Sequence, residues 1–327
     1  MPNPGRIMTE PFSHFVGIDW SGAKGRRHGG IAVAICAEGE GAPSLVAPPD
    51  GKRLWSREVC ARWIAGGCGL RAGERALVGL DSAFSMPFID QGGYLGADFA
   101  ADTVMALWQA VEKCCATGED LFAGAFVDRH QQHYHRPGDR GENFSRRMRI
   151  TETRAVESGA GPCESVFHLI GPSQVGLAGL SSMRMLAHFK AQNAQFLHTS
   201  VQSGQALEIA VWPYDVSKGA AVTLVEIYAA AFAAMGGHRG KIRDAVTLSS
   251  VLEKLDSKTI RFRNESLGKS PVKSSVKSPV KFPSDHACDA LITSAALRHI
   301  SGMRKYWHPP QLSTMVRRTE GWVFGIL

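Results

Sequence analysis

Four acidic side chains occupy positions from which they could hold a metal ion. They end or interrupt apolar segments that lie far apart in the chain: Asp19, Asp81, Glu226 and Asp289. A carboxylate at the end of an apolar strand costs free energy if it is buried without a partner, and several carboxylates together repel one another. A hard divalent cation resolves both problems, because it binds the oxygens directly.

The chemistry that such a cluster predicts is phosphodiester hydrolysis with Mg²⁺ or Mn²⁺. Two ions about 3.5–4 Å apart can clamp the attacking and the leaving oxygen in a two-metal-ion mechanism. Asp285 precedes Asp289 by four residues, on the same face of an expected helix, and is a fifth candidate ligand. We predict that Asp19, Asp81 and Asp289 hold the metal and that Glu226 or Asp285 completes the set. The catalytic residues would be Asp19, Asp81, Glu226 and Asp289.

Each acid also has a structural interpretation. Asp19 and Asp81 each begin a polar break and could be turn or cap residues. Glu226 could pair with an arginine, and Asp285 suits the first turn of a helix, where the helix dipole favours an acid. Asp289 could be a solvated helix position. The arrangement of the whole set, rather than any one acid, therefore favours a metal site.

The segments around these acids predict an α/β fold. Two hairpin-linked strands at the start of the chain favour a mixed sheet of five or more strands with helices on both faces. Apolar runs predict strands at 14–19, 30–36, 44–47, 76–81, 207–212, 222–228 and 321–326. Helical spacing predicts helices at 55–65, 101–115, 174–192, 229–235 and 285–300, the last capped by Ser284.

The length of 327 residues suits one elaborated domain over residues 14–327. A disordered leader is expected at 1–13 and a mainly helical insertion at about 84–205. Residues 264–284 contain the unit KSPVK twice, and their proline and lysine content predicts a flexible basic loop.

The basic balance of the chain permits binding to a polyanion. The net charge is +7, and arginines and histidines gather at 129–154. Candidate substrate-binding residues are Lys24, Arg26, Arg154 and His286, which would contact nucleic acid, either DNA or RNA. In the alternative interpretation the arginines of 129–154 pair with carboxylates such as Glu142, Glu152 and Glu157, and the cations near Lys24 are a solvated hairpin tip.

Several protein classes are disfavoured. No apolar run approaches the ~18 residues that span a bilayer, and the N-terminus lacks a signal-peptide core, so we expect a cytoplasmic protein with no membrane partner. The seven cysteines form no CxxC pair, which argues against structural zinc. GxSxG, GxGxxG and P-loop motifs are absent, which disfavours serine hydrolases, nicotinamide enzymes and P-loop ATPases.

The motifs resemble a domain-of-unknown-function family of predicted RNase H-like nucleases. The matching pieces are GIDWSGA, GLDSAFSMP, FHLIGPSQVG, WPYD, VEIYAAAF, DHACDALITSAAL and EGWVFGI. The family usually has proline where Ala229 stands. The resemblance implies an RNase H-like sheet with acids on the first strand, the fourth strand and the last core helix. The segment from His286 to Asp289 also resembles the HxxD element of resolvase-type members.

Three functions remain open at this point. The first is a metal-dependent nuclease acting on Mg²⁺ or Mn²⁺ held by the acids. The second is a noncatalytic nucleic-acid-binding module that kept the fold. The third is a sugar-kinase or actin-like ATPase, which shares the core but needs two copies of it. The oligomeric state is open as well.

Overall fold

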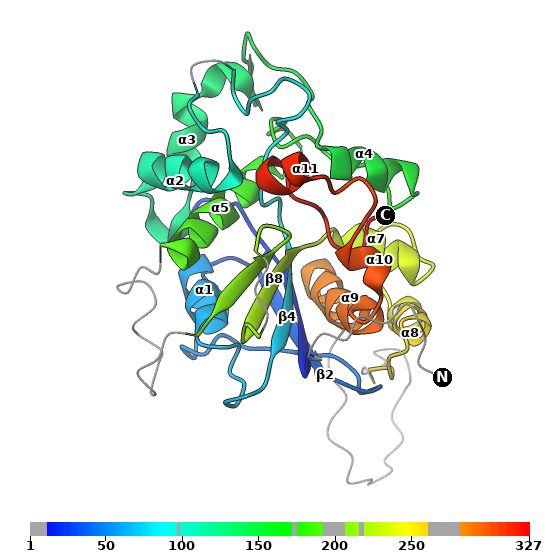
Figure 1. Ribbon diagram of the computed structural model, residues 1–327. Helices are drawn as coiled ribbons and strands as arrows, with labels where there is room; N and C mark the ends of the chain where they lie inside the picture. The colour runs from blue at the N-terminus through cyan, green and yellow to red at the C-terminus, as the bar shows by residue number, and fades with distance from the viewer. Residues whose placement is uncertain (1–11, 97–98, 172–174, 192–206, 216–218, 261–281) are drawn as a thin grey trace, which may run out of the picture.

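The computed structural model describes residues 12–96, 99–171, 175–191, 207–215, 219–260 and 282–327. It is an α/β structure built on a six-stranded sheet (Figure 1). The strands are β1 (His14–Asp19), β2 (Ala32–Ala37), β3 (Ser44–Leu45), β4 (Ala76–Asp81), β7 (Ile209–Trp212) and β8 (Val222–Glu226).

The sheet is mixed, with the strand order β3-β2-β1-β4-β8-β7. The first three strands form an antiparallel meander, whereas β4, β8 and β7 all run parallel to β1. The prediction of a mixed α/β sheet is confirmed. Because β1, β4 and β8 are parallel, their carboxyl ends lie at one edge of the sheet.

Side chains on β1 alternate between the two faces of the sheet, as a pleated strand requires. Val16 and Ile18 pack in a core with α1 (Arg57–Ala65) and α5 (Gly176–Lys190), whereas Phe15 packs in a second core with α9 (Asp285–Ile300). Helices α7 (Ala229–Met235), α8 (Ala245–Lys254), α10 (Arg304–Trp307) and α11 (Thr314–Thr319) also contribute to the core on the α9 side. Helices therefore cover both faces, as predicted (Figure 1).

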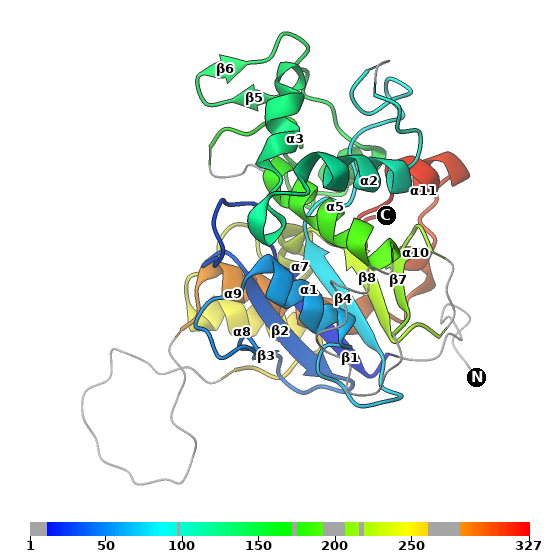
Figure 2. The ribbon, with the colours of Figure 1, turned by 90° about the vertical axis from the view of Figure 1, so that its left-hand side faces the viewer.

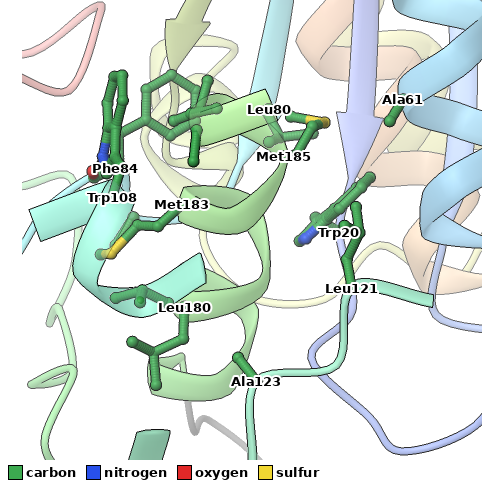
Figure 3. Packing of buried hydrophobic residues seen from close by; sticks show 14 of the residues in the cluster. Trp20, Ala61, Leu80, Phe84, Trp108, Leu121, Ala123, Leu180, Met183 and Met185 are labelled. Atoms are coloured by element: carbon green, nitrogen blue, oxygen red, sulfur yellow. Dashed lines mark hydrogen bonds between the residues drawn. The ribbon is translucent and has the colours of Figure 1, made fainter. Parts of the chain in front are cut away.

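In the described part of the segment between β4 and β7, helices alternate with long irregular stretches, and the segment lies beyond the carboxyl ends of the central strands (Figure 2). Trp108, Leu180 and Met183 of this segment join the core that also contains Leu80 of β4 (Figure 3). Its elements are α2 (Val104–Cys115), η1 (Glu119–Leu121), α3 (Gly124–Arg129), η2 (Gln131–His133), β5 (His135–Arg136), β6 (Asp139–Arg140), α4 (Ile150–Glu157) and α5. The β5–β6 hairpin was not expected from the irregular sequence there.

The two ends of the chain differ from the prediction. Residues 321–326 form no strand: α11 (Thr314–Thr319) precedes them, and they follow it as a turn that buries Trp322 and Phe324. The amide of Phe324 donates to the carbonyl of Glu226, so this segment is fixed to β8 without pairing as a strand. At the other end, Phe12 is buried and stacks on Trp307. The expected leader is thus wrong for residues 12–13, while residues 1–11, and residues 264–281 of the expected basic loop, lie outside the described residues.

Candidate functional site

Two of the predicted acids meet at the carboxyl edge of the sheet. Asp19 and Asp81 pair in register as the last residues of the parallel β1 and β4 strands. Residues opposite each other in a ladder point to the same face. Asp19 is two residues after Gly17, whose position faces α9, so both carboxyl groups point towards the α9 side of the sheet.

Helix α9 brings two more polar side chains to this edge. Ser284 caps it by accepting the amide of Ala287, so the helix begins beside the strand ends. Nδ1 of His286 lies 2.7 Å from Oδ2 of Asp19. Asp289 stands one turn further along and is half-buried. The first strand, the fourth strand and the helix therefore bring Asp19, Asp81 and Asp289 to the same edge of the sheet.

The three carboxyl groups influence one another electrostatically. Burial raises the pKa of Asp81 well above its ordinary value, and the negative charges of Asp19 and Asp289 raise it further. Burial, followed by the charge of Asp19, raises the pKa of Asp289 to about 7. Burial also raises the pKa of Asp19, against the opposing hydrogen bond from His286. That same bond raises the pKa of His286 and favours its cationic form.

The chemistry of this donor set suits a hard divalent cation. Three carboxyl groups that resist ionisation together are stabilised by a positive charge between them, and Mg²⁺ and Mn²⁺ prefer oxygen ligands. Within the described residues, however, no three His, Cys, Asp or Glu side chains are already arranged to hold a metal. Binding would therefore require the side chains of Asp19, Asp81 and Asp289 to turn towards one another.

Glu226 lies at the same edge of the sheet but points to the opposite face, and its charge also raises the pKa of Asp81. It pairs in register with Leu80, and both Leu80 and Leu224 face the α1–α5 core. The side chain of Glu226 therefore points to the α1–α5 face of the sheet, opposite to the face of Asp19 and Asp81. Its carboxylate accepts hydrogen bonds from both terminal nitrogens of Arg149, one of them at 2.9 Å, and from the backbone amide of Phe84 at 2.9 Å. The structural interpretation, pairing with an arginine, therefore describes the geometry of Glu226.

Arg149 is the centre of a buried ionic network, and its pairs with Glu152 and Glu226 agree with the structural interpretations given for these acids. It is 1% exposed, and its charge is also balanced by Glu152, whose Oε1 lies 2.9 Å from its Nε. Its Nη1 further donates to the carbonyl of Glu320 at 3.2 Å. The carboxylate of Glu320 in turn accepts backbone amides, including that of Ile150. The network joins the end of β8 to α4 and to the C-terminal turn.

Asp285 lies at the rim of the site and forms an ion pair. Nζ of Lys241 lies 3.0 Å from Oδ2 of Asp285, and this contact lowers the pKa of the carboxyl group. Lys241 belongs to an exposed basic segment with Arg239 and Arg243, anchored by the buried side chain of Ile242. The motif HRGKIR at 238–243 was the available sequence signal for these cations.

The glycine-rich turn after Asp19 is held by a second buried arginine that sequence reasoning missed. Arg57 is fully buried and donates to the carbonyls of Ser21 and Ala23 at 2.7 and 3.0 Å. Burial lowers its pKa to about 10, although the nearby carboxylate of Asp120 opposes this. Asp120 also contacts His28 at 2.9 Å. The insertion therefore fixes the turn beside the candidate site.

The predicted substrate-binding cations have varied surroundings. Lys24 is exposed, and Arg26 forms an exposed ion pair with Glu119. Arg154 donates to Glu157 at 2.5 Å and to the carbonyl of Leu327. Other arginines of 129–154 are paired in the same manner, as with Arg136, Arg146, Arg147 and Arg149. The pairing expected in the alternative interpretation is thus common in this stretch.

A cavity of about 280 Å³ adjoins the acids. Asp19 and Asp81 lie on its wall together with Arg149 and Glu226, and most of the remaining lining is apolar. All seven cysteines are free, and Cys163 is among the lining residues.

No helix within the described ranges is both long and apolar enough to cross a membrane. Comparison with known proteins adds no identification: no family model, curated protein or solved structure matched this chain.

Proposed function

We propose that this protein is a metal-dependent nuclease with an RNase H-like fold. The observation that carries the proposal is the convergence of Asp19, Asp81 and Asp289, which come from the first strand, the fourth strand and the last long helix. These are the three places that the resemblance to RNase H-like nucleases implies. The mixed order of the sheet, an antiparallel meander followed by parallel strands, supports the same fold.

In this proposal Asp19, Asp81 and Asp289 hold Mg²⁺ or Mn²⁺. When bound, such an ion polarises a phosphoryl oxygen and makes a water molecule nucleophilic at neutral pH. His286 orients Asp19 through its Nδ1 contact, and its cationic form places positive charge beside the entering phosphate. Arg57 holds the glycine-rich turn next to Asp19, so the site is supported by residues that do not touch the substrate.

Asp285 and Glu226 have different roles in this proposal from those expected of ligands. Asp285 pairs with Lys241 at the rim, and Glu226 is neutralised by Arg149. A charge already balanced by a bidentate arginine gains less from a cation than an unbalanced one. We therefore assign Glu226 to supporting the site and keep Asp285 as an outer contact.

The test is cleavage of labelled single-stranded, duplex and branched DNA and RNA with Mn²⁺ or with EDTA. We expect cleavage with Mn²⁺ that EDTA abolishes and that Asp19→Asn and Asp289→Asn each lower by at least about 100-fold. Asp256→Asn is the matched control, because Asp256 is 79% exposed and pairs with His299 near the other end of α9. Cleavage that survives Asp19→Asn contradicts the proposal.

The second candidate, a noncatalytic nucleic-acid-binding module, is favoured by one observation. The described part of the chain holds no ready-made group of three metal-ligating side chains. This candidate predicts nucleic-acid binding with a steep salt dependence and no cleavage of any substrate. Thermal melting with and without Mn²⁺ separates the two, because a bound ion raises the melting temperature only where the acids take it up. The ATPase alternative would instead show stabilisation by ATP.

A further inference from the structure

The cavity beside Asp19 and Asp81 has a mixed wall. Its charged part consists of Asp19, Asp81, Arg149, Glu152, Glu164 and Glu226, and its apolar part includes Ala178, Ile227 and Val323. Tyr228 completes this wall, and its hydroxyl donates to the carbonyl of Pro162 at 2.9 Å, which fixes the ring. Ile227 and Val323 are 2% and 5% exposed, so the wall is part of the packed structure.

The volume of the cavity limits what can enter it. About 280 Å³ is close to the lower end of the ~300–1,000 Å³ usual for ligand pockets. This room is comparable with the size of one ring-sized group. A phosphate that reached the two acids would therefore bring a neighbouring nucleoside into the cavity, and that nucleoside has to leave its base stack first.

The apolar wall suits the base of such a nucleoside. Bases bind to aromatic and aliphatic side chains through their flat faces, with little dependence on sequence. Tyr228 offers an aromatic ring held in place by its hydroxyl, and Ala178 lies in the first turn of α5. Extracting a base from a duplex costs free energy, whereas a single strand or a frayed end has little or nothing to unpair.

We propose that this cavity binds one unpaired nucleoside next to the scissile phosphate, so that the substrates are single strands and frayed ends rather than continuous duplex. This inference rests on the proposed nuclease function and specifies its substrate class. It assigns Ala178 and Tyr228 to specificity, a role that no sequence motif indicated.

The main test is Ala178→Leu, which adds bulk to the cavity wall at a residue that is not one of the proposed metal ligands. Its control is Ala106→Leu on α2, a half-buried alanine that packs on the same core but does not line the cavity. With Mn²⁺ we expect the unaltered protein to cleave a single-stranded oligonucleotide about tenfold or more faster than the same sequence as a closed circular duplex. Ala178→Leu should lower the single-strand rate about tenfold, and Ala106→Leu should leave it within about twofold.

Hydrolysis of a small diester tests the metal chemistry independently of binding in the cavity. Bis(p-nitrophenyl) phosphate needs no nucleoside pocket, so Ala178→Leu should leave its hydrolysis within about threefold. Equal cleavage of single-stranded and circular duplex DNA overturns the inference. So does equal loss of both activities in a folded Ala178→Leu protein. If Ala178→Leu fails to fold, Tyr228→Ala and Tyr228→Phe replace it, with loss expected only for the alanine variant.

Binding without turnover distinguishes failure of this inference from failure of the proposed function. A single-stranded oligonucleotide carrying 2-aminopurine is titrated with the protein in EDTA. We expect its fluorescence to change on binding, and Tyr228→Ala to weaken binding about tenfold. Binding that depends on Tyr228 without any cleavage would reject the nuclease and leave the nucleoside site standing. Cleavage without a Tyr228 or Ala178 effect would reject the site and leave the nuclease.

Discussion

Asp19 and Asp81 lie directly opposite each other as the last residue pair of the parallel β1–β4 ladder. Two carboxyl groups at such a position repel when both are ionised, and Asp289 adds a third from α9. Like charges gathered at one sheet edge lower the stability of the folded state. The arrangement therefore has a cost that a bound cation would offset, and the cost itself can be measured.

The first prediction concerns the pH dependence of stability without metal. The pKa of Asp289 is about 7 in the folded protein, against an ordinary value of 3.8. Between these values the folded state retains a proton that the unfolded chain has lost. The free energy of unfolding should therefore fall as the pH rises from about 4 to about 7. Asp289→Asn should flatten this slope and stabilise the protein at pH 7.5 by about 1–3 kcal/mol.

Urea unfolding in EDTA at several pH values measures this effect. Asp256→Asn serves as the control, since Asp256 is exposed and pairs with His299 near the C-terminal end of α9. Asp81→Asn should flatten the slope as well, because burial holds the pKa of Asp81 well above its ordinary value. An unchanged slope in Asp289→Asn would contradict the prediction.

Much of the scaffold follows from local sequence. The strands β1 and β4 and the helices α7 and α9 have the predicted bounds, because apolar runs ending in an acid and a serine cap are strong signals. The two aspartates that end β1 and β4 could be placed together for the same reason. Parallel strands leave their carboxyl ends at one edge, so neighbouring strand-end acids meet.

The direction of Glu226 could not be predicted in this way. Its strand reads VTLVE and is buried on both faces, so the apolar pattern does not show which side chains face which core. Its partner Arg149 is 77 residues away, in a stretch without periodicity. Pairings of that kind depend on the tertiary structure. The same reason hides the contact between Arg57 and the glycine-rich turn.

The second prediction separates a supporting role of Glu226 from a ligand role. Glu226→Gln leaves Arg149 fully buried with Glu152 as its remaining carboxylate, so we expect a loss of about 2–4 kcal/mol in the free energy of unfolding. The rise in melting temperature on adding Mn²⁺ should remain. Asp102→Asn breaks the exposed pair with Arg318 and should cost no more than about 1 kcal/mol. Loss of the Mn²⁺ response in Glu226→Gln, with little change in stability, would make Glu226 a ligand.

The third prediction concerns the exposed basic segment beside Asp285. Arg239 and Arg243 flank Lys241, which reaches Asp285 at the start of α9. If a nucleic-acid backbone passes this rim, removing both arginines should lower the slope of log affinity against log salt by about 1–2. Binding should weaken to a similar extent for all sequences, because phosphate contacts carry no base information.

The matched control for that variant is Arg71→Ala with Lys258→Ala. Both residues are exposed. Arg71 precedes β4, and Lys258 bonds through its amide to Glu40 in the β2–β3 turn, so both lie at the other edge of the sheet. Filter binding or fluorescence anisotropy at four salt concentrations gives the slopes. Equal slopes for the two double variants would remove the basic segment from the binding surface.

The fourth prediction tests how closely α9 must approach β1. A Cβ added to Gly17 would lie 2.2 Å from the carbonyl oxygen of Ala290 and 2.7 Å from the amide nitrogen of Ser294. Both atoms belong to the helix backbone and cannot rotate away, so Gly17→Ala must push α9 from the sheet. We expect a loss of about 3 kcal/mol in the free energy of unfolding. The shift would also separate Asp289 from Asp19 and weaken the stabilisation by Mn²⁺. Gly29→Ala is the control, since nothing lies within 4 Å of its added Cβ. Similar urea midpoints and Mn²⁺ responses for the two variants would show that the site does not depend on this contact.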